Sequence, residues 1–201
     1  MSPNAPFLAP ERDGAFKFGR PRAGATTYYT IPGVSARSVS TWALAVDLDY
    51  YTPWYTSTPL MIDQLAFEVT TALASSNTRV GFYAADGDWQ PVGPPLADSG
   101  DIATASTGVK TYAPGAPIYV RRGRYLSVLN HSITGNVTMR TGSGSMSGSG
   151  FATGLGASAC LAALKATRAH AAFPNPGTAW TAVDADTGGF HNMVFYRVSS
   201  P

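Results

Sequence analysis

Residues 60–89 constrain the fold of this chain most, because their side chains alternate between apolar and polar. From Leu65 onward the alternation has a period of two, which gives a strand one apolar face and one wet face. Residues 74–77 are small and polar, as in a turn, and a second strand-like run begins at Arg79. Asp86 and Gly87 suit a type I′ turn, in which both central residues need a positive φ. The segment therefore predicts two strands of an antiparallel β protein.

Turn signals recur roughly every ten residues along the chain, a spacing that is typical of a β-sandwich or jelly roll. Strands are predicted near residues 26–31, 40–51, 61–71, 78–85, 107–113, 118–120, 125–131 and 194–199. The segment 90–95 is rich in Pro and Gly, so it can hold only edge-strand or loop backbone. We expect an all-β fold, an antiparallel β-sandwich that resembles a jelly roll, with an extended N-terminal arm.

The chain divides into two predicted parts. Residues 1–25 have three prolines within the first ten positions and little periodicity, which predicts an extended attachment arm; a floppy terminus is the alternative. Four apolar side chains of the arm are candidate anchors on a neighbouring protein: Phe7, Leu8, Phe16 and Phe18. Residues 26–201 are predicted to form the sandwich, with a flexible Gly/Ser-rich loop at 141–150. Within it, residues 157–170 have high helix propensity and predict a short helix.

Composition narrows the range of partners. Only 13% of the 201 residues are charged, about half the usual share, which fits a surface packed against copies of itself. The net charge of +2 is too small to indicate nucleic-acid binding, and the one dense basic cluster, residues 121–124, is predicted to be a hairpin turn. Cys160 is the only cysteine, so no internal disulfide can form. We expect neither a signal peptide nor membrane insertion.

Motifs for catalysis are missing from the sequence. It contains no GxSxG elbow, no HExxH pair, no P-loop, and no GxGxxG after a strand. The three histidines, at positions 131, 170 and 191, lie far apart in the sequence and lack metal-ligand spacing. We therefore expect no enzymatic activity, no cofactor and no bound metal.

Two pairs of carboxylates have the spacing to ligate calcium together with a loop carbonyl. Asp86 and Asp88 form one pair, and Asp184 and Asp186 form the other. Both pairs lie beside glycine in turn-like sequence, where Asp is favoured because it hydrogen-bonds its own backbone. The turn interpretation is the preferred one.

Residues 47–55 belong to a predicted strand region. Asp47 and Asp49 are expected to be polar positions on its wet face. Trp54 and Tyr55 are expected in the core or in a subunit interface.

Aromatic residues in loops are the better candidates for binding. Trp89 follows Asp-Gly-Asp, and Trp180 lies in a loop-rich region. Sugar rings present C–H faces that stack on such side chains, whereas carboxylates hydrogen-bond the sugar hydroxyls. Packing is the alternative role for both tryptophans. The candidate ligand-binding residues are Asp86, Asp88, Trp89 and Trp180.

A longer pattern spans residues 50–129. It comprises Tyr-Tyr-Thr-Pro-Trp-Tyr at 50–55, Leu-x-Ile-Asp-x-Leu-x-x-Glu-Val-Thr-Thr at 60–71, Arg-Val-Gly-Phe-Tyr at 79–83, the Asp-Gly pair at 86–87, Leu-Ala-Asp-Ser-Gly at 96–100, Thr-Gly-Val-Lys at 107–110 and the tyrosines at 119 and 125. In order and spacing it resembles a domain of bacteriophage tail-fibre, head-fibre and related minor structural proteins. Met-Val-Phe-Tyr-Arg-Val at 193–198 is similar to the closing strand of that domain, so the resemblance covers most of the chain from about Tyr28 onward.

This resemblance implies an antiparallel jelly roll, usually a homotrimer on a virion or phage-like particle assembled in the bacterial cytoplasm. It also implies contact with capsid, portal or tail proteins and host adsorption, often through surface polysaccharide. The ligand-binding residues of the family follow no fixed motif, so none is carried over. We therefore expect a fibre or spike component. The alternatives are a decoration, collar or adaptor subunit without a receptor of its own, and a polysaccharide depolymerase.

Overall fold

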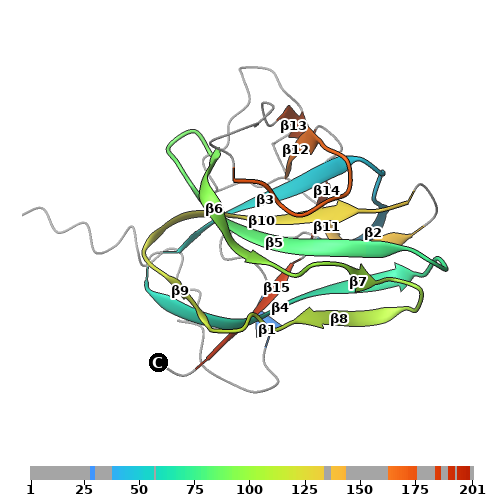
Figure 1. Cartoon of the computed structure of the whole chain (residues 1–201), viewed down its shortest axis with the longest axis horizontal. Helices are drawn as coiled ribbons and strands as arrows, with labels where there is room; N and C mark the ends of the chain where they lie inside the picture. Colours follow the sequence, from blue (N-terminus) through green and yellow to red (C-terminus); the bar gives the residue numbers. More distant parts are fainter. Residues whose placement is uncertain are drawn as a thin grey trace, which may run out of the picture.

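The structure is a computed structural model that describes residues 28–29, 38–56, 58–133, 137–143, 163–175, 184–186, 190–192 and 194–199. These residues form two antiparallel sheets packed as a sandwich, which confirms the predicted fold class (Figure 1). The predicted arm at 1–25 lies outside the described residues. So do residues 144–150 of the predicted Gly/Ser loop, whereas residues 141–143 end a strand. None of the described segments forms a helix that could cross a membrane.

The first sheet contains eight strands among the described residues. Its longest strand is β4 (Leu60–Thr71), which pairs on one side with β8 (Gly108–Tyr112) and β9 (Ile118–Val120). On its other side β4 pairs with β15 (Phe195–Val198) and β11 (Thr138–Ser143). The remaining strands of this sheet are β1 (Tyr28–Tyr29), β2 (Ser38–Ala43) and β14 (Phe190–Asn192).

The second sheet contains seven strands in the described part of the chain. Six lie side by side in the order β13 (Asp184–Asp186), β12 (Ala163–Thr167), β3 (Leu48–Thr56), β10 (Gly123–His131), β5 (Asn77–Ala85) and β6 (Pro91–Asp98). The seventh, β7 (Ile102–Ala103), pairs with β5. The segment 90–95 therefore contributes to an edge strand, as predicted from its prolines, which have no N–H to donate.

The chain passes repeatedly from one sheet to the other, and this gives the sandwich the strand order of a jelly roll. In the first sheet β2, β11 and β4 are followed by β8 and β9; in the second, β3, β10, β5 and β6 are neighbours. The predicted strands 61–71 and 78–85 both form, as β4 and β5, but they lie in opposite sheets. A turn between them contains Ser75, whose φ is +61°.

The basic cluster at residues 121–124 also lies where the chain passes from one sheet to the other. It leads from β9 in the first sheet to β10 in the second, so the predicted hairpin turn is wrong. Both strands bury their apolar side chains in the shared interior: Ile118 and Val120 from β9, and Tyr125 and Leu129 from β10. Crossing to the facing sheet lets each strand contribute to the same core.

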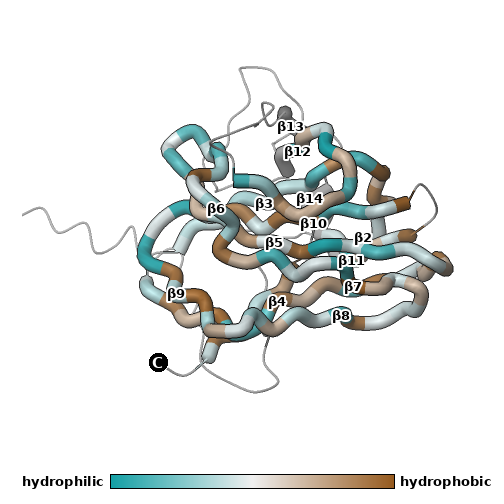
Figure 2. Tube along the Cα trace, viewed as in Figure 1, coloured by the Kyte–Doolittle hydropathy of each residue, from teal (hydrophilic) through white to brown (hydrophobic). Residues whose placement is uncertain are grey.

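The predicted period of two is visible in the burial of the strands. Val194, Tyr196 and Val198 expose only 2%, 4% and 6% of their surface, and the residues between them are more exposed, as predicted. In β9 the burial alternates as well, with Ile118 and Val120 buried and Tyr119 exposed. Figure 2 shows how hydrophobic and hydrophilic positions are distributed along the chain. The apolar faces of the two sheets therefore meet in one core.

Aromatic side chains fill the centre of this core. The ring of Trp54 lies 5.0 Å from that of Phe82, 5.2 Å from that of Tyr125 and 5.5 Å from that of Tyr196. Phe82 and Tyr125 stack on each other with an interplanar angle of 7°. Trp54 is 3% exposed, as expected for a core residue, whereas its neighbour Tyr55 is 43% exposed on the opposite face of β3.

The helix predicted over residues 157–170 is wrong in its described part. Residues 163–167 form strand β12, which pairs antiparallel with β3 from Leu164 opposite Tyr51 to Thr167 opposite Leu48. β3 offers its free backbone groups along that edge, and pairing with them outweighs the helix propensity of an alanine-rich segment. Residues 157–162 lie outside the described residues.

Replacing Trp54 with Ala should destabilise the sandwich by about 3–5 kcal/mol, because it leaves a cavity among three aromatic rings. Tyr55→Ala, one residue along the same strand but on the exposed face, should cost less than about 1 kcal/mol. Chemical denaturation followed by fluorescence of the remaining tryptophans measures both. Equal losses in the two variants would contradict the assignment of the two faces.

Candidate functional site

The loop between β5 and β6 carries three of the four predicted ligand-binding residues. The N–H of Asp86 donates to the carbonyl of Gln90 at 3.0 Å, and the N–H of Trp89 donates to the carbonyl of Asp86 at 3.3 Å. Trp89 has a φ of +60°, while neither Asp86 nor Gly87 has a positive φ. This is a three-residue hairpin loop that ends in a left-handed residue, so the predicted type I′ turn is wrong.

The carboxylate of Asp86 holds this loop together. Its Oδ1 atom accepts hydrogen bonds from the N–H of Asp88 at 2.9 Å and from the N–H of Gln90 at 2.8 Å. These bonds match the turn interpretation of the Asp86–Asp88 pair. Asp88 itself is exposed. In the part of the chain that the structure describes, no group of three or more His, Cys, Asp or Glu side chains is placed to hold a metal ion.

The Trp89 side chain contacts Arg124 and packs against the second sheet. The guanidinium carbon of Arg124 lies 5.3 Å from the centre of the Trp89 ring, within the range of a cation–π contact. The Nη1 atom of Arg124 lies 3.5 Å from the carbonyl oxygen of Asp86, at the far limit of a hydrogen bond. Trp89 also packs at the margin of an apolar cluster on the outer face of the second sheet. Its ring is therefore fixed in place at the surface.

The other predicted site residues are not brought to this loop by the described structure. Trp180 lies outside the described residues, as do the four proposed anchors Phe7, Leu8, Phe16 and Phe18. Asp184 and Asp186 lie in β13, a strand, where a turn was predicted.

The outer face of the second sheet, on the side away from the core, is partly covered by residues 168–175, which we call the strap. It follows β12 and crosses over β10 and β5 (Figure 1). Beneath it, Tyr51, Tyr83 and Val128 are completely buried although they point away from the main core. Phe173 of the strap completes this second apolar cluster, with its ring 6.3 Å from that of Tyr83.

The strap approaches the sheet closely at Gly81. A Cβ atom at this position would lie 2.6 Å from the ring of Phe173 and 2.9 Å from Val128. Side-chain carbon atoms do not come this close without displacing one another. A glycine in β5 is therefore what lets Phe173 lie flat against the sheet.

A buried ion pair fastens the beginning of the strap. Asp49 was predicted on a wet face, but it is completely buried. Arg168 of the strap donates to both of its oxygens, from Nη2 to Oδ1 at 2.9 Å and from Nε to Oδ2 at 2.5 Å. Tyr51 donates to Oδ2 at 3.0 Å and Asn130 to Oδ1 at 2.7 Å. The prediction fails because four donors compensate the carboxylate for its loss of water.

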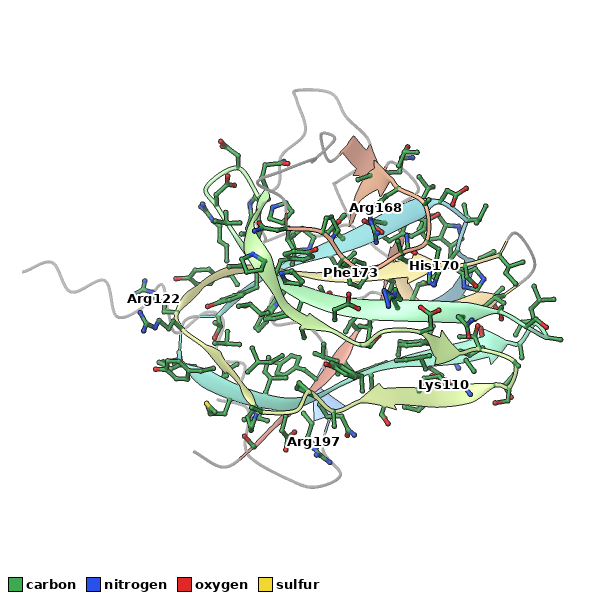
Figure 3. All side chains as sticks on the ribbon, viewed as in Figure 1. Lys110, Arg122, Arg168, His170, Phe173 and Arg197 are labelled. Atoms are coloured by element: carbon green, nitrogen blue, oxygen red, sulfur yellow. The ribbon has the colours of Figure 1, made fainter. Side chains whose placement is uncertain are left out.

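The strap is also tied down along its length. Figure 3 shows Arg168, His170 and Phe173 following one another across the sheet. The imidazole of His170 lies between the side-chain oxygen of Asn130 at Nδ1 and that of Asp101 at Nε2, the latter at 3.1 Å. The N–H of Phe173 donates to Oδ2 of Asp98 at 2.9 Å. His170 therefore ties the strap to Asn130 of β10 and to Asp101, which follows β6.

Sequence reasoning missed this network for a clear reason. Asp49 and Arg168 are 119 positions apart, and no motif links them. The only available signal was the charge of Asp49 in β3, a strand that is otherwise uncharged and is buried on both faces.

His131 follows Asn130 at the end of β10 and is completely buried. Its Nδ1 atom lies 2.9 Å from the hydroxyl of Thr78, and its Nε2 atom has no hydrogen-bond partner among the described residues. Burial lowers the pKa of His131 below its ordinary value, and the neighbouring His170 lowers it further. The folded protein therefore favours the neutral imidazole.

Comparison with known proteins gives no family: no protein-family model matches the chain, and no curated protein matches it. What the chain does is therefore inferred from its own residues and from the geometry described above.

Gly81→Ala should push Phe173 off the sheet and loosen the strap while the main core stays intact, at a cost of about 1–3 kcal/mol. Hydrogen exchange of the strap amides should speed up, while that of β4 should not change. Gly115→Ala is the matched control, because a Cβ atom there meets nothing within 4 Å. Unchanged exchange at Phe173 in Gly81→Ala would contradict the close packing of the strap.

Stability should fall as the pH falls from 7.5 to 5.5. The pKa of His131 is lower in the folded state than in the unfolded state, where it is about 6.5. The unfolded chain therefore binds the proton more readily than the folded protein. The contribution of His131 to the free energy of unfolding is complete above pH 6.5 and decreases below it. Each unit of pKa shift is worth about 1.4 kcal/mol.

His131→Gln removes this titration but keeps His170 and all carboxylates. The free energy of unfolding should therefore depend less steeply on pH in the variant than in the original chain, as measured by urea denaturation at each pH. Parallel curves for the two proteins would show that His131 is not buried as a neutral group.

Proposed function

We propose that this chain is a non-enzymatic structural protein of a phage or phage-like particle. It works there as a fibre or spike component that attaches the particle to polysaccharide on the host surface. The resemblance of residues 50–129 to tail-fibre and head-fibre domains supports this role. The strand order of the two sheets also supports it, because the resemblance implies a jelly roll.

One observation carries the attachment role, namely the construction of the loop between β5 and β6. Asp86 uses its carboxylate to fix the backbone, and the loop ends by holding Trp89 at the surface under Arg124. Because ring and guanidinium are already ordered, a ligand that contacts them loses little of its binding energy to ordering the loop. Asp88, exposed on the same loop, adds a hydrogen-bond acceptor for sugar hydroxyls.

Self-association into a trimer is part of the proposal. β6 and β8 each pair with a single strand among the described residues, so both lie at sheet edges. They expose Val92 (51%), Leu96 (42%) and Val109 (60%), which are large apolar side chains suited to a subunit contact. In the assembled particle residues 1–25 dock onto capsid, portal or tail proteins, and weak binding at each sandwich is strengthened by multivalency.

The second candidate function is a decoration, collar or adaptor subunit without a receptor of its own. The same loop favours this function, because Asp86 hydrogen-bonds the backbone of its own turn and Trp89 is partly packed against the sheet. A loop built only for stability would have these contacts too.

Adsorption separates the two candidates. Particles that lack the chain should adsorb to the host more slowly, and Trp89→Ala should slow adsorption by at least about fivefold, because multivalency amplifies each lost contact. The purified protein should bind host polysaccharide and have three times the mass of one chain in light scattering. Gly115→Ala serves as the control. Normal adsorption without the chain, with no polysaccharide bound, would favour the decoration role.

A further inference from the structure

Beyond the edge of the strap, the outer face of the second sheet carries a row of alternating aromatic and guanidinium side chains. We call Trp89, Arg124, Tyr55 and Arg122 the aromatic–arginine row. Arg124 of β10 pairs with Tyr55 of β3 on one side and with Ala85 of β5 on the other, so these residues share one face. That face is opposite to the one on which Trp54 enters the core.

Direct contacts link the members of the row. Arg124 lies over the Trp89 ring at 5.3 Å, and the Nε atom of Arg122 donates to the hydroxyl of Tyr55 at 2.9 Å. Tyr55 is 43% exposed and Arg124 is exposed. The row extends from β3 across β10 to the loop after β5. Two strand spacings separate its ends, a span of about 10 Å, which is wider than one sugar ring.

Arg124 differs from most other arginines in the described structure in its ion pairing. Four arginines form ion pairs with carboxylates: Arg79, Arg140, Arg168 and Arg197. Arg124 has no carboxylate partner among the described residues, and neither has Arg121. Asp86 and Asp88 are both exposed in the neighbouring loop, but the carboxylate of Asp86 accepts hydrogen bonds from the backbone of that loop and neither acid forms an ion pair with Arg124. The charge of Arg124 is therefore not neutralised by a carboxylate of the described residues.

We propose that the aromatic–arginine row binds an anionic polysaccharide, one whose sugars carry carboxylate groups. Arg124 pairs with a sugar carboxylate through two parallel N–H donors, which a guanidinium offers and an ammonium does not. Tyr55, and the part of the Trp89 ring that Arg124 and the sheet leave accessible, contact the apolar C–H faces of the rings on either side. The cation–π contact holds Arg124 in position before the ligand arrives. This inference rests on the proposed attachment to polysaccharide and specifies its substrate class.

Two other ligands fit the row less well. A neutral polysaccharide would use the aromatic rings but leave the charge of Arg124 without a partner. A single-stranded nucleic acid could stack on the same rings, but it carries one charge per nucleotide and is bound along a wide basic groove. The net charge of the whole chain is only +2, and four arginines are already paired within the fold.

The test uses the full chain and three probes: polygalacturonate as the anionic polysaccharide, pullulan as a neutral one, and a 12-nucleotide thymidine oligomer. Titration calorimetry should detect polygalacturonate binding that weakens as NaCl is raised from 50 to 300 mM. Arg124→Gln should weaken this binding at least about tenfold, because a charge-assisted hydrogen-bonded pair is lost. Tyr55→Ala should weaken it severalfold at every salt concentration.

Lys110→Gln is the matched control. It removes the same unit of charge from an exposed strand, β8, at the other end of the molecule from Arg122 (Figure 3). It should change polygalacturonate affinity by less than about twofold. Near-ultraviolet circular dichroism verifies that each variant is folded; Arg124 is exposed, so its replacement leaves the core intact.

The outcomes separate the inference from the function on which it rests. Binding of pullulan as tightly as polygalacturonate, unaffected by Arg124→Gln, overturns the anionic class and leaves polysaccharide attachment standing. Binding of neither polysaccharide overturns both. Tighter binding of the thymidine oligomer overturns the inference in favour of nucleic acid. An equal loss in Lys110→Gln and Arg124→Gln overturns the assignment of the site, because it indicates attraction by net charge alone.

Discussion

The buried carboxylate of Asp49 is the constraint on which the outer face of the second sheet depends. A charge without water is costly to hold unless donors surround it, and here they come from β3, from β10 and from Arg168 beyond β12. Arg168 also donates to the carbonyls of Ala171 and Ala172, at 3.1 Å and 3.2 Å, so the same guanidinium shapes the strap. Burial, with the charge of Asp49, raises the pKa of Tyr51 far above its ordinary value, which keeps this phenol a donor.

The strap divides the outer face into two regions, one covered and one exposed. Under it, Tyr83 and Phe173 form a second small core, and the Tyr83 hydroxyl donates to the carbonyl of Pro174 at 2.7 Å. Beyond it, Tyr55 and Arg124 remain exposed on the same strands. Trp89 packs against the margin of the covered region, so the two regions are in contact. A surface that is ordered before contact binds with a smaller entropic cost.

Much of the fold could be predicted from the sequence, because a period of two depends only on each strand having one buried face. This is why β4 and β15 were found close to their actual bounds, whereas β8, none of whose residues is buried, was located by the turn residues on either side of it. Sheet membership could not be found in this way, since β4 and β5 alternate similarly but face each other across the core. The loop at Asp86 and Trp89 was located correctly, but its turn type depends on the backbone of Trp89. The burial of Asp49 depends on a partner far along the chain, which no local pattern reveals.

The two edge strands of the second sheet affect how copies of this chain can associate. One end is β13, which has three residues, and the other is β6, whose prolines at 91, 94 and 95 lack N–H groups. Neither offers the long run of free donors and acceptors that lets a foreign strand extend a sheet. In its described part this sheet therefore resists growth by strand addition, the route that leads to fibrous aggregates. Many copies can then lie close together on one surface while each keeps its own fold. Copies that touch along this sheet would do so through side chains and not through shared strands.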